Sequence, residues 1–185
     1  RTISLVTFEN SEVISEFDLQ GFFNRVARGE EYSETRLREL LRYNVRPMYE
    51  EKGRMGVKFC PCSAVDDPDN FGMRVAVQVD EGPEYQYGAV PPPEIPGFEP
   101  EKVEGMYSPK AGAAVNMKLA RESQAAIEET MRANGFIRAR TQLDVAVDDE
   151  AKTVDLDFVV DPGYRYSFDR LVIEGLDILA EPIIR

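Results

Sequence analysis

The feature that most constrains this chain is a repeat with a period of about 80 residues. An amphipathic helical stripe followed by two segments of alternating apolar and polar residues occurs twice, and Gly53 and Gly135 stand after the two stripes. In the second copy the helical pattern spans 119–131, and the alternating segments span 141–147 and 154–160. Tandem copies of one supersecondary unit predict an array of similar modules. The first copy has the same order, at 37–49, 57–59 and 73–79.

Each copy is preceded by the pattern of a short strand and a short helix. In the first copy these are 3–8 and 17–26, and Ser33 is a predicted N-cap of the long helix. Pro47 is expected to kink that helix or end its regular part early, and Pro61 is expected to limit the strand that follows. The sequence therefore predicts an α+β fold of tandem β-α-α-β-β modules.

Composition narrows the possible partners. The chain has 185 residues, is 43% hydrophobic and carries a formal charge of -12, which favours a folded core and disfavours binding to the phosphates of nucleic acid. It contains no apolar run of the roughly 20 residues that a membrane-spanning helix needs. Both ends fall inside apparent patterns, so we expect the chain to be a piece of a longer protein.

Residues suited to catalysis or metal binding are scarce. The chain has no histidine, and Cys60 and Cys62 are its two cysteines. The acidic pairs at 66–67 and 148–149 fall in predicted turns, and the pair at 155 and 157 lies on the outer face of a strand. We expect no enzymatic activity, no cofactor and no bound metal.

The order of these motifs resembles a known family. The helix end at 51–53, the Glu-Gly-Pro-Glu-Tyr junction at 81–85, the Ala-Asn-Gly-Phe end at 133–136 and the Val-Ile-Glu-Gly segment at 172–175 are similar to those of POTRA domains. These domains precede the β-barrel of BamA- and TamA-type outer-membrane assembly proteins, also called the surface antigen family. Three departures stand out: Asn10 in place of a glycine, Pro47, and an insert at 91–93.

The resemblance implies a domain plan. A first module would cover residues 1–82, a second 83–162, and the start of a third 163–185. Each would be a three-stranded mixed sheet with two helices on one face. The hinges between modules would lie at Gly82, Pro83, Pro162 and Gly163.

The resemblance also implies a function in the periplasm of Gram-negative bacteria. The partners would be unfolded outer-membrane proteins, accessory assembly lipoproteins and the chain's own C-terminal β-barrel. In such modules the second strand is a sheet edge that binds an extended peptide through its backbone. The residues expected on the two edges are Val57, Lys58 and Phe59 in the first module and Arg138, Ala139, Arg140, Thr141, Gln142, Leu143 and Val145 in the second. The second edge is preferred because its strand is predicted to be longer and has no proline.

Other interpretations stay open. One alternative is a two-partner secretion transporter, which uses the same domains for one secreted client, and another is an adhesin-like array with no client. The alternative interpretation of the edges is that they are protected, with Pro61, Arg138 and Arg140 as the protecting residues. Aromatic residues near the predicted junctions are expected to pack the modules against each other; they are Tyr85, Tyr87, Phe98, Tyr107 and Tyr164.

Overall fold

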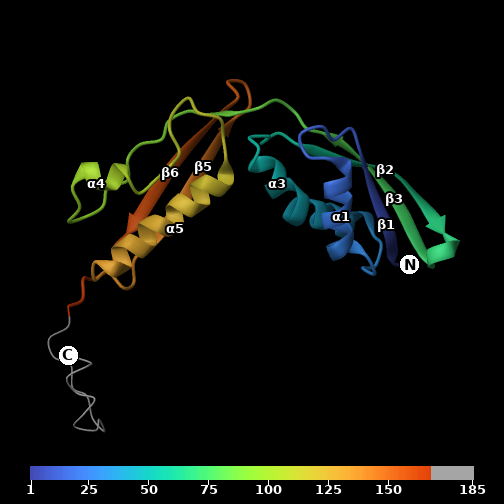
Figure 1. The fold of residues 1–185 in the computed structure, drawn as a ribbon, viewed down its shortest axis with the longest axis horizontal. Coiled ribbons are helices and arrows are strands. Elements are labelled where there is room, and N and C mark those ends of the chain that lie inside the picture. The colour runs from blue at the N-terminus through green and yellow to red at the C-terminus, as the bar shows by residue number, and fades with distance from the viewer. Residues whose placement is uncertain (168–185) are drawn as a thin grey trace, which may run out of the picture.

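The chain forms two three-stranded sheets, one after the other. The structure, a computed structural model, describes residues 1–167. Figure 1 shows two units, each a sheet with its helices, connected by an extended segment. We call residues 1–80 the N-terminal unit and residues 86–161 the C-terminal unit. None of the helices within the described residues has the length and apolar character needed to cross a bilayer.

The N-terminal unit has the predicted β-α-α-β-β order. Its sheet is mixed, with the order β1-β3-β2: β1 is parallel to β3, and β2 is antiparallel to it. The predicted fold class is therefore confirmed. The elements are β1 (Ile3–Glu9), α1 (Glu16–Ala27), α2 (Glu34–Leu40), the π-helical segment η1 (Leu41–Val45), α3 (Arg46–Glu50), β2 (Lys58–Asp67), the 3-10 turn η2 (Pro68–Asn70) and β3 (Gly72–Asp80).

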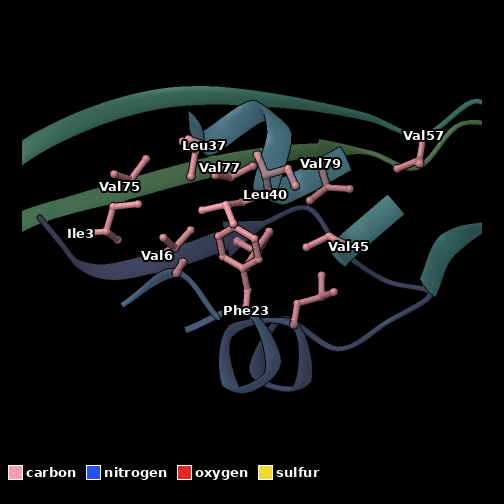
Figure 2. Packing of buried hydrophobic residues seen from close by; sticks show 14 of the residues in the cluster. Ile3, Val6, Phe23, Leu37, Leu40, Val45, Val57, Val75, Val77 and Val79 are labelled. Atoms are coloured by element: carbon pink, nitrogen blue, oxygen red, sulfur yellow. The ribbon is translucent and has the colours of Figure 1, made fainter. Parts of the chain in front are cut away.

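Helices cover one face of this sheet and bury a single apolar core. Figure 2 shows Phe23 of α1 and Leu37 of α2 directed toward the strands. Phe8 and Phe23 meet edge to face, with 5.6 Å between ring centroids, a favourable arrangement for two aromatic rings. Val75 and Val77 of the central strand are fully buried beneath them.

The long helix of this unit accommodates Pro47 through a change of helical winding. Ser33 caps its start by accepting a hydrogen bond from the amide of Arg36, as predicted. The predicted kink or early end takes the form of the wider π segment η1, in which the amide of Arg46 bonds to the carbonyl of Leu41. The side chain of Asn44 also donates to the carbonyl of Leu40, at 2.9 Å. The helix thereby continues to Glu50 although Pro47 has no amide hydrogen.

The prediction that Pro61 limits the following strand is wrong. β2 continues through Pro61 to Asp67, and its register with β3 shifts between Pro61 and Ser63. An edge strand tolerates a proline when the missing amide would have pointed away from the sheet, and a bulge absorbs the irregularity. Asp66 and Asp67, predicted to form a turn, are the last residues of this strand.

The C-terminal unit repeats the topology with different proportions. Its sheet has the order β4-β6-β5, with β4 parallel and β5 antiparallel to β6. Val103 of α4, Ile127 of α5 and Phe158 of β6 are buried in one cluster, so both helices pack on the same face. The elements are β4 (Gln86–Tyr87), α4 (Pro100–Glu104), α5 (Met117–Ala133), β5 (Arg140–Asp148) and β6 (Thr153–Asp161).

Two departures from the family pattern have different outcomes. Asn10 follows β1 with a positive φ of 62°, a left-handed conformation that asparagine adopts more readily than most residues, so it takes the role of the missing glycine. The prolines at 91–93 instead leave β4 only two residues long. Of the predicted third module, residues 163–167 have no regular secondary structure, and 168–185 lie outside the described residues.

Candidate functional site: the open sheet edges

Both strands expected to bind a peptide lie at sheet edges. β3 is the central strand of the N-terminal unit and β6 that of the C-terminal unit, so β2 and β5 each have one side without a neighbouring strand. An edge strand presents amide and carbonyl groups to which another extended chain can bond. The question is which of these groups are available.

The direction of the backbone groups of β5 follows from its register. In an antiparallel pair, successive residues alternately bond to the partner strand and point away from it. The amide of Thr141 bonds to the helix α5 and not to β6, so Thr141 points outward. By the same alternation the amides and carbonyls of Leu143, Val145 and Val147 point outward.

Helix α5 closes the first part of this edge. The amide of Thr141 donates to Glu128 Oε1 at 2.8 Å, and its carbonyl accepts from Gln124 Nε2 at 2.5 Å. Gln124 and Glu128 are four residues apart and therefore on one helix face. Within residues 1–167, no hydrogen bond reaches the outward groups of Leu143, Val145 or Val147. The open edge is therefore 143–147.

The predicted C-terminal binding edge needs a correction at its start. Arg138 and Ala139 precede β5, and Ala139 is buried beneath a turn in which its amide bonds to the carbonyl of Phe136. Arg140 and Gln142 belong to β5, but by the same alternation their backbone groups face β6 and not the open edge. Sequence reasoning missed the closure at Thr141, although Gln124 and Glu128 at helical spacing were a signal that could have been read.

The side chains along the open part are apolar and accessible. Val145 and Val147 are 41% and 45% exposed, and Leu143 is half-buried. They share one face of the sheet with buried Thr141, since alternate residues of a strand face the same side. At the closed end, a groove of about 980 Å³ is lined by residues that include Arg132, Arg138 and Arg140.

β2 presents a more interrupted edge. Met73 of β3 bonds to the carbonyl of Thr2, so residues 73, 75, 77 and 79 of β3 face β1. The β2 residues opposite 79 and 77 are Phe59 and Pro61, which therefore point outward. Pro61 has no amide to offer, and the register shifts immediately after it. Proline and bulges are two means by which proteins protect sheet edges.

The reasons for preferring β5 are thus only partly correct. β2 has 10 residues and β5 has 9, so the prediction that the second strand is longer is wrong. Val57 is buried and precedes β2, while Lys58 and Phe59 begin the strand beside a groove of about 650 Å³. β5 is distinguished by its uninterrupted register and lack of proline.

The far end of β2 is held by a buried carboxylate. Asp67 accepts a hydrogen bond from the Ser4 hydroxyl at 2.9 Å and another from the Asn70 side chain at 3.1 Å. These two bonds, with Arg74 at 3.5 Å, hold the pKa of Asp67 below its usual range. This arrangement fixes β2 to β1 and β3 and points to a structural role.

The first predicted hinge, at Gly82 and Pro83, is held by contacts from the N-terminal unit. Gly82 has a φ of 62°, and its carbonyl accepts from the Arg54 guanidinium at 2.7 Å, while Pro83 is exposed. Met55 belongs to the N-terminal unit but packs in a cluster with Tyr85 of the connecting segment and with residues of the C-terminal unit that include Val115 and Val154. The Arg54 bond therefore holds the N-terminal unit to the connecting segment, and the Met55 cluster holds it to the C-terminal unit.

The second predicted hinge, at Pro162 and Gly163, has two of the hydrogen bonds seen at the first. The amide of Gly163 bonds to Asp161 Oδ1 at 3.1 Å, as that of Gly82 bonds to Asp80 Oδ1 at 3.2 Å. Pro162 lies in the middle of this turn. In both places a glycine carbonyl at the helix end accepts from a tyrosine amide beyond the turn: Gly53 from Tyr85 at 2.9 Å, and Gly135 from Tyr166 at 2.7 Å.

The aromatic residues predicted near the junctions have different roles. Tyr85 is buried at the joint, where its hydroxyl donates to Asp149 at 2.6 Å, and Tyr87 lies in the same cluster as Met55. Phe98 and Tyr107 pack in the C-terminal unit's own core instead. For these two the prediction of inter-module packing is wrong. Tyr164 is 82% exposed, and residues 168–185 of the third module, against which it was predicted to pack, lie outside the described residues.

The remaining candidate groups add no further site. Cys60 pairs in register with Gln78 of β3, and Cys62 falls at the register shift. Across residues 1–167, no three side chains of the types His, Cys, Asp and Glu gather closely enough to hold a metal ion. The sheet edges remain the candidate site.

Known structures share the fold of this chain. No family model matches the sequence. The structure is similar to POTRA domains 3–5 of BamA from Haemophilus influenzae, with a TM-score of 0.60 and 18% identity over 99% of this chain and 74% of that one. It is also similar to BamA from Haemophilus ducreyi lacking POTRA domains 1–3, with a TM-score of 0.54 and 12% identity over 86% of this chain and 29% of that one. The chain therefore has the fold of POTRA domains arranged in tandem.

Proposed function

We propose that this chain is the periplasmic segment of an outer-membrane protein assembly factor and binds extended clients by adding them as a strand to β5. The observation that carries the proposal is the run of outward backbone groups at Leu143, Val145 and Val147, to which no other described residue bonds. Backbone pairing reads little sequence, which suits a factor that must accept many unfolded β-strands.

Three features support this assignment. The fold is that of BamA POTRA domains. The available edge is flanked by accessible apolar side chains, Val145 and Val147, against which alternate residues of a client strand can pack. The chain has no histidine, and its acidic pairs lie in a hairpin turn and along strands, which favours a binding role over catalysis.

The partners we propose are unfolded outer-membrane proteins and accessory assembly lipoproteins, presented to a C-terminal β-barrel of the same protein. The two-partner secretion alternative stays a prediction. A set of strand peptides from different barrel proteins separates the two, since an assembly factor binds many of them with similar affinity and a dedicated transporter binds few.

The test compares Leu143→Pro with Leu143→Ala. Leu143→Ala shortens the side chain and keeps the outward amide, whereas Leu143→Pro removes that amide and leaves the bonds to β6 in place. The probe is a fluorescein-labelled ten-residue peptide from a transmembrane β-strand, titrated in fluorescence anisotropy. We expect Leu143→Pro to weaken binding by about 5- to 10-fold, corresponding to one hydrogen bond of ~1 kcal/mol, and Leu143→Ala to weaken it by less than about 3-fold.

Circular dichroism and thermal unfolding show whether each variant is folded. A folded Leu143→Pro protein that binds the peptide as tightly as the unsubstituted chain would overturn the proposal. Equal losses in both variants would assign the effect to the side chain and not to backbone pairing.

A further inference from the structure

The central strand β6 has a second open edge, on the side opposite β5. The residues of β6 that face β4 follow from three bonds: Gln86 donates to the carbonyl of Lys152, Gly88 donates to that of Val154, and the amide of Leu156 donates to that of Ala89. Even-numbered residues of β6 therefore face this side. Beyond Leu156 these are Phe158 and Val160.

No strand covers this second half of β6. β4 pairs with β6 only at Thr153 and Val154, and the neighbouring chain departs after Ala89 into the prolines at 91–93. Within the described part of the chain, no hydrogen bond reaches the groups of Phe158 and Val160 that face this side. A polyproline segment supplies no amide donors, which explains why pairing stops here.

The N-terminal unit shows what normally fills this position. Asp80 and Asp161 end the central strands of the two units in the same kind of turn, so Val77 corresponds to Phe158. Val77 is paired with Phe8 of β1, and Gln78 with Glu9. The C-terminal unit thus lacks the last residues of a first strand, and the equivalent length of β6 has no partner.

A groove lies beside β6 where the missing residues of the first strand would pair. It has a volume of about 950 Å³ and runs between β6 residues 157–160 and loop residues 91–98. Buried Ile95 and Val103 are part of its wall, and the carboxylates of exposed Glu94 and Asp157 stand at its rim. An apolar base beside unpaired backbone groups suits an extended peptide with apolar residues at alternate positions. The acidic rim favours lysine or arginine between them.

We propose that this groove binds an extended, basic segment of a partner protein, which completes the sheet along Phe158 and Val160. A second copy of this chain is disfavoured as the occupant because the formal charge of -12 makes two copies repel each other. The site is separate from the β5 edge and uses the opposite side of the central strand.

The test uses two seven-residue peptides labelled with fluorescein: one alternates valine and lysine, and the other alternates valine and glutamate. Val160→Pro removes an amide that faces the groove and donates no hydrogen bond to β5, since Val160 and Thr141 are a non-hydrogen-bonded pair. Val160→Ala is the matched control. We expect the lysine peptide to bind the unsubstituted chain more tightly than the glutamate peptide. Val160→Pro should weaken its binding by about 5- to 10-fold, the loss of one hydrogen bond, and Val160→Ala by less than about 3-fold.

Two further variants keep the outcome interpretable. Glu94→Lys, in the exposed loop, should weaken binding of the lysine peptide even if Val160→Pro does not fold. Leu143→Pro should leave it unchanged, because that substitution removes an amide from the outer edge of β5 and none from the groove. Absence of lysine-peptide binding to the unsubstituted chain, or unchanged affinity in both Glu94→Lys and a folded Val160→Pro, would overturn this proposal. Loss in Leu143→Pro alone would assign the peptide to β5 and overturn it as well.

Discussion

The two units share one topology but differ in which backbone groups they leave open. In the N-terminal unit, β1 covers the central strand from Ile3 to Glu9, and the outer edge at β2 is interrupted by Pro61 and a bulge. In the C-terminal unit, β4 covers only two residues, and the outer edge at β5 is continuous. Proline placement accounts for much of this difference: one proline protects an edge, and three prolines expose another.

The comparison indicates a division of roles. The N-terminal unit has a single core in which one sheet face is covered along its length, whereas the buried residues of the C-terminal unit fall into two clusters, one of which includes Met55 of its neighbour. A unit with open backbone groups on both sides of its sheet is better suited to accept an added strand. The N-terminal unit is better suited to support it.

The largest expected effect tests whether the units are separate folding bodies. Phe23→Ala should lower the free energy of unfolding of the N-terminal unit by about 3–5 kcal/mol, and Ile127→Ala that of the C-terminal unit by about 2–5 kcal/mol, because each leaves a cavity in a fully buried site. Native-state hydrogen exchange of the amides of Val77 and Leu156, the latter bonded to the carbonyl of Ala89, measures the two units independently. Equal acceleration at both amides in each variant would show that the units unfold together and would break the comparison.

A smaller effect concerns the closure of β5 by its helix. Glu128→Ala should destabilise the C-terminal unit by ~1–3 kcal/mol, since it removes the acceptor of the buried Thr141 amide. The exchange of that amide should accelerate, as measured by NMR. Glu129→Ala, at the exposed next position, is the matched control and should change neither quantity. Unchanged exchange at Thr141 in Glu128→Ala would mean that the helix does not close this edge.

The smallest expected effect sharpens the contrast between β2 and β5. Pro61→Val restores one outward amide in β2, and we expect peptide binding to the N-terminal unit to strengthen by about 2- to 5-fold, less than a full hydrogen bond because the bulge remains. The strand peptide is titrated by fluorescence anisotropy in the Leu143→Pro background, where binding at β5 is weakened and binding at β2 can be measured. Pro83→Ala, in the connecting segment, is the control. Identical affinities for Pro61→Val and its parent would show that the bulge alone protects β2.

Much of the fold was predictable because it rests on local patterns. The two helical stripes, the alternation along β3, β5 and β6, and the N-cap at Ser33 are all properties of short segments, and the structure contains each of them. The predictions that failed concern places where a distant segment decides. β2 continues past Pro61 because β3 pairs with the residues before and after it. Phe98 and Tyr107 pack with Phe158 of their own unit and not between the units.

By itself, the sequence determined the repeat and the β-α-α-β-β order of each unit, because hydrophobic periodicity and glycine positions act within a few residues. The resemblance to POTRA domains, and not these patterns, implied which strands become edges. Only the tertiary structure decided which edge groups remain available. Thr141 is closed by side chains 13 and 17 residues earlier in α5, and Phe158 is open because residues 91–93 leave the sheet. Backbone hydrogen bonding between segments distant in sequence depends on how those segments pack, and no local pattern records it.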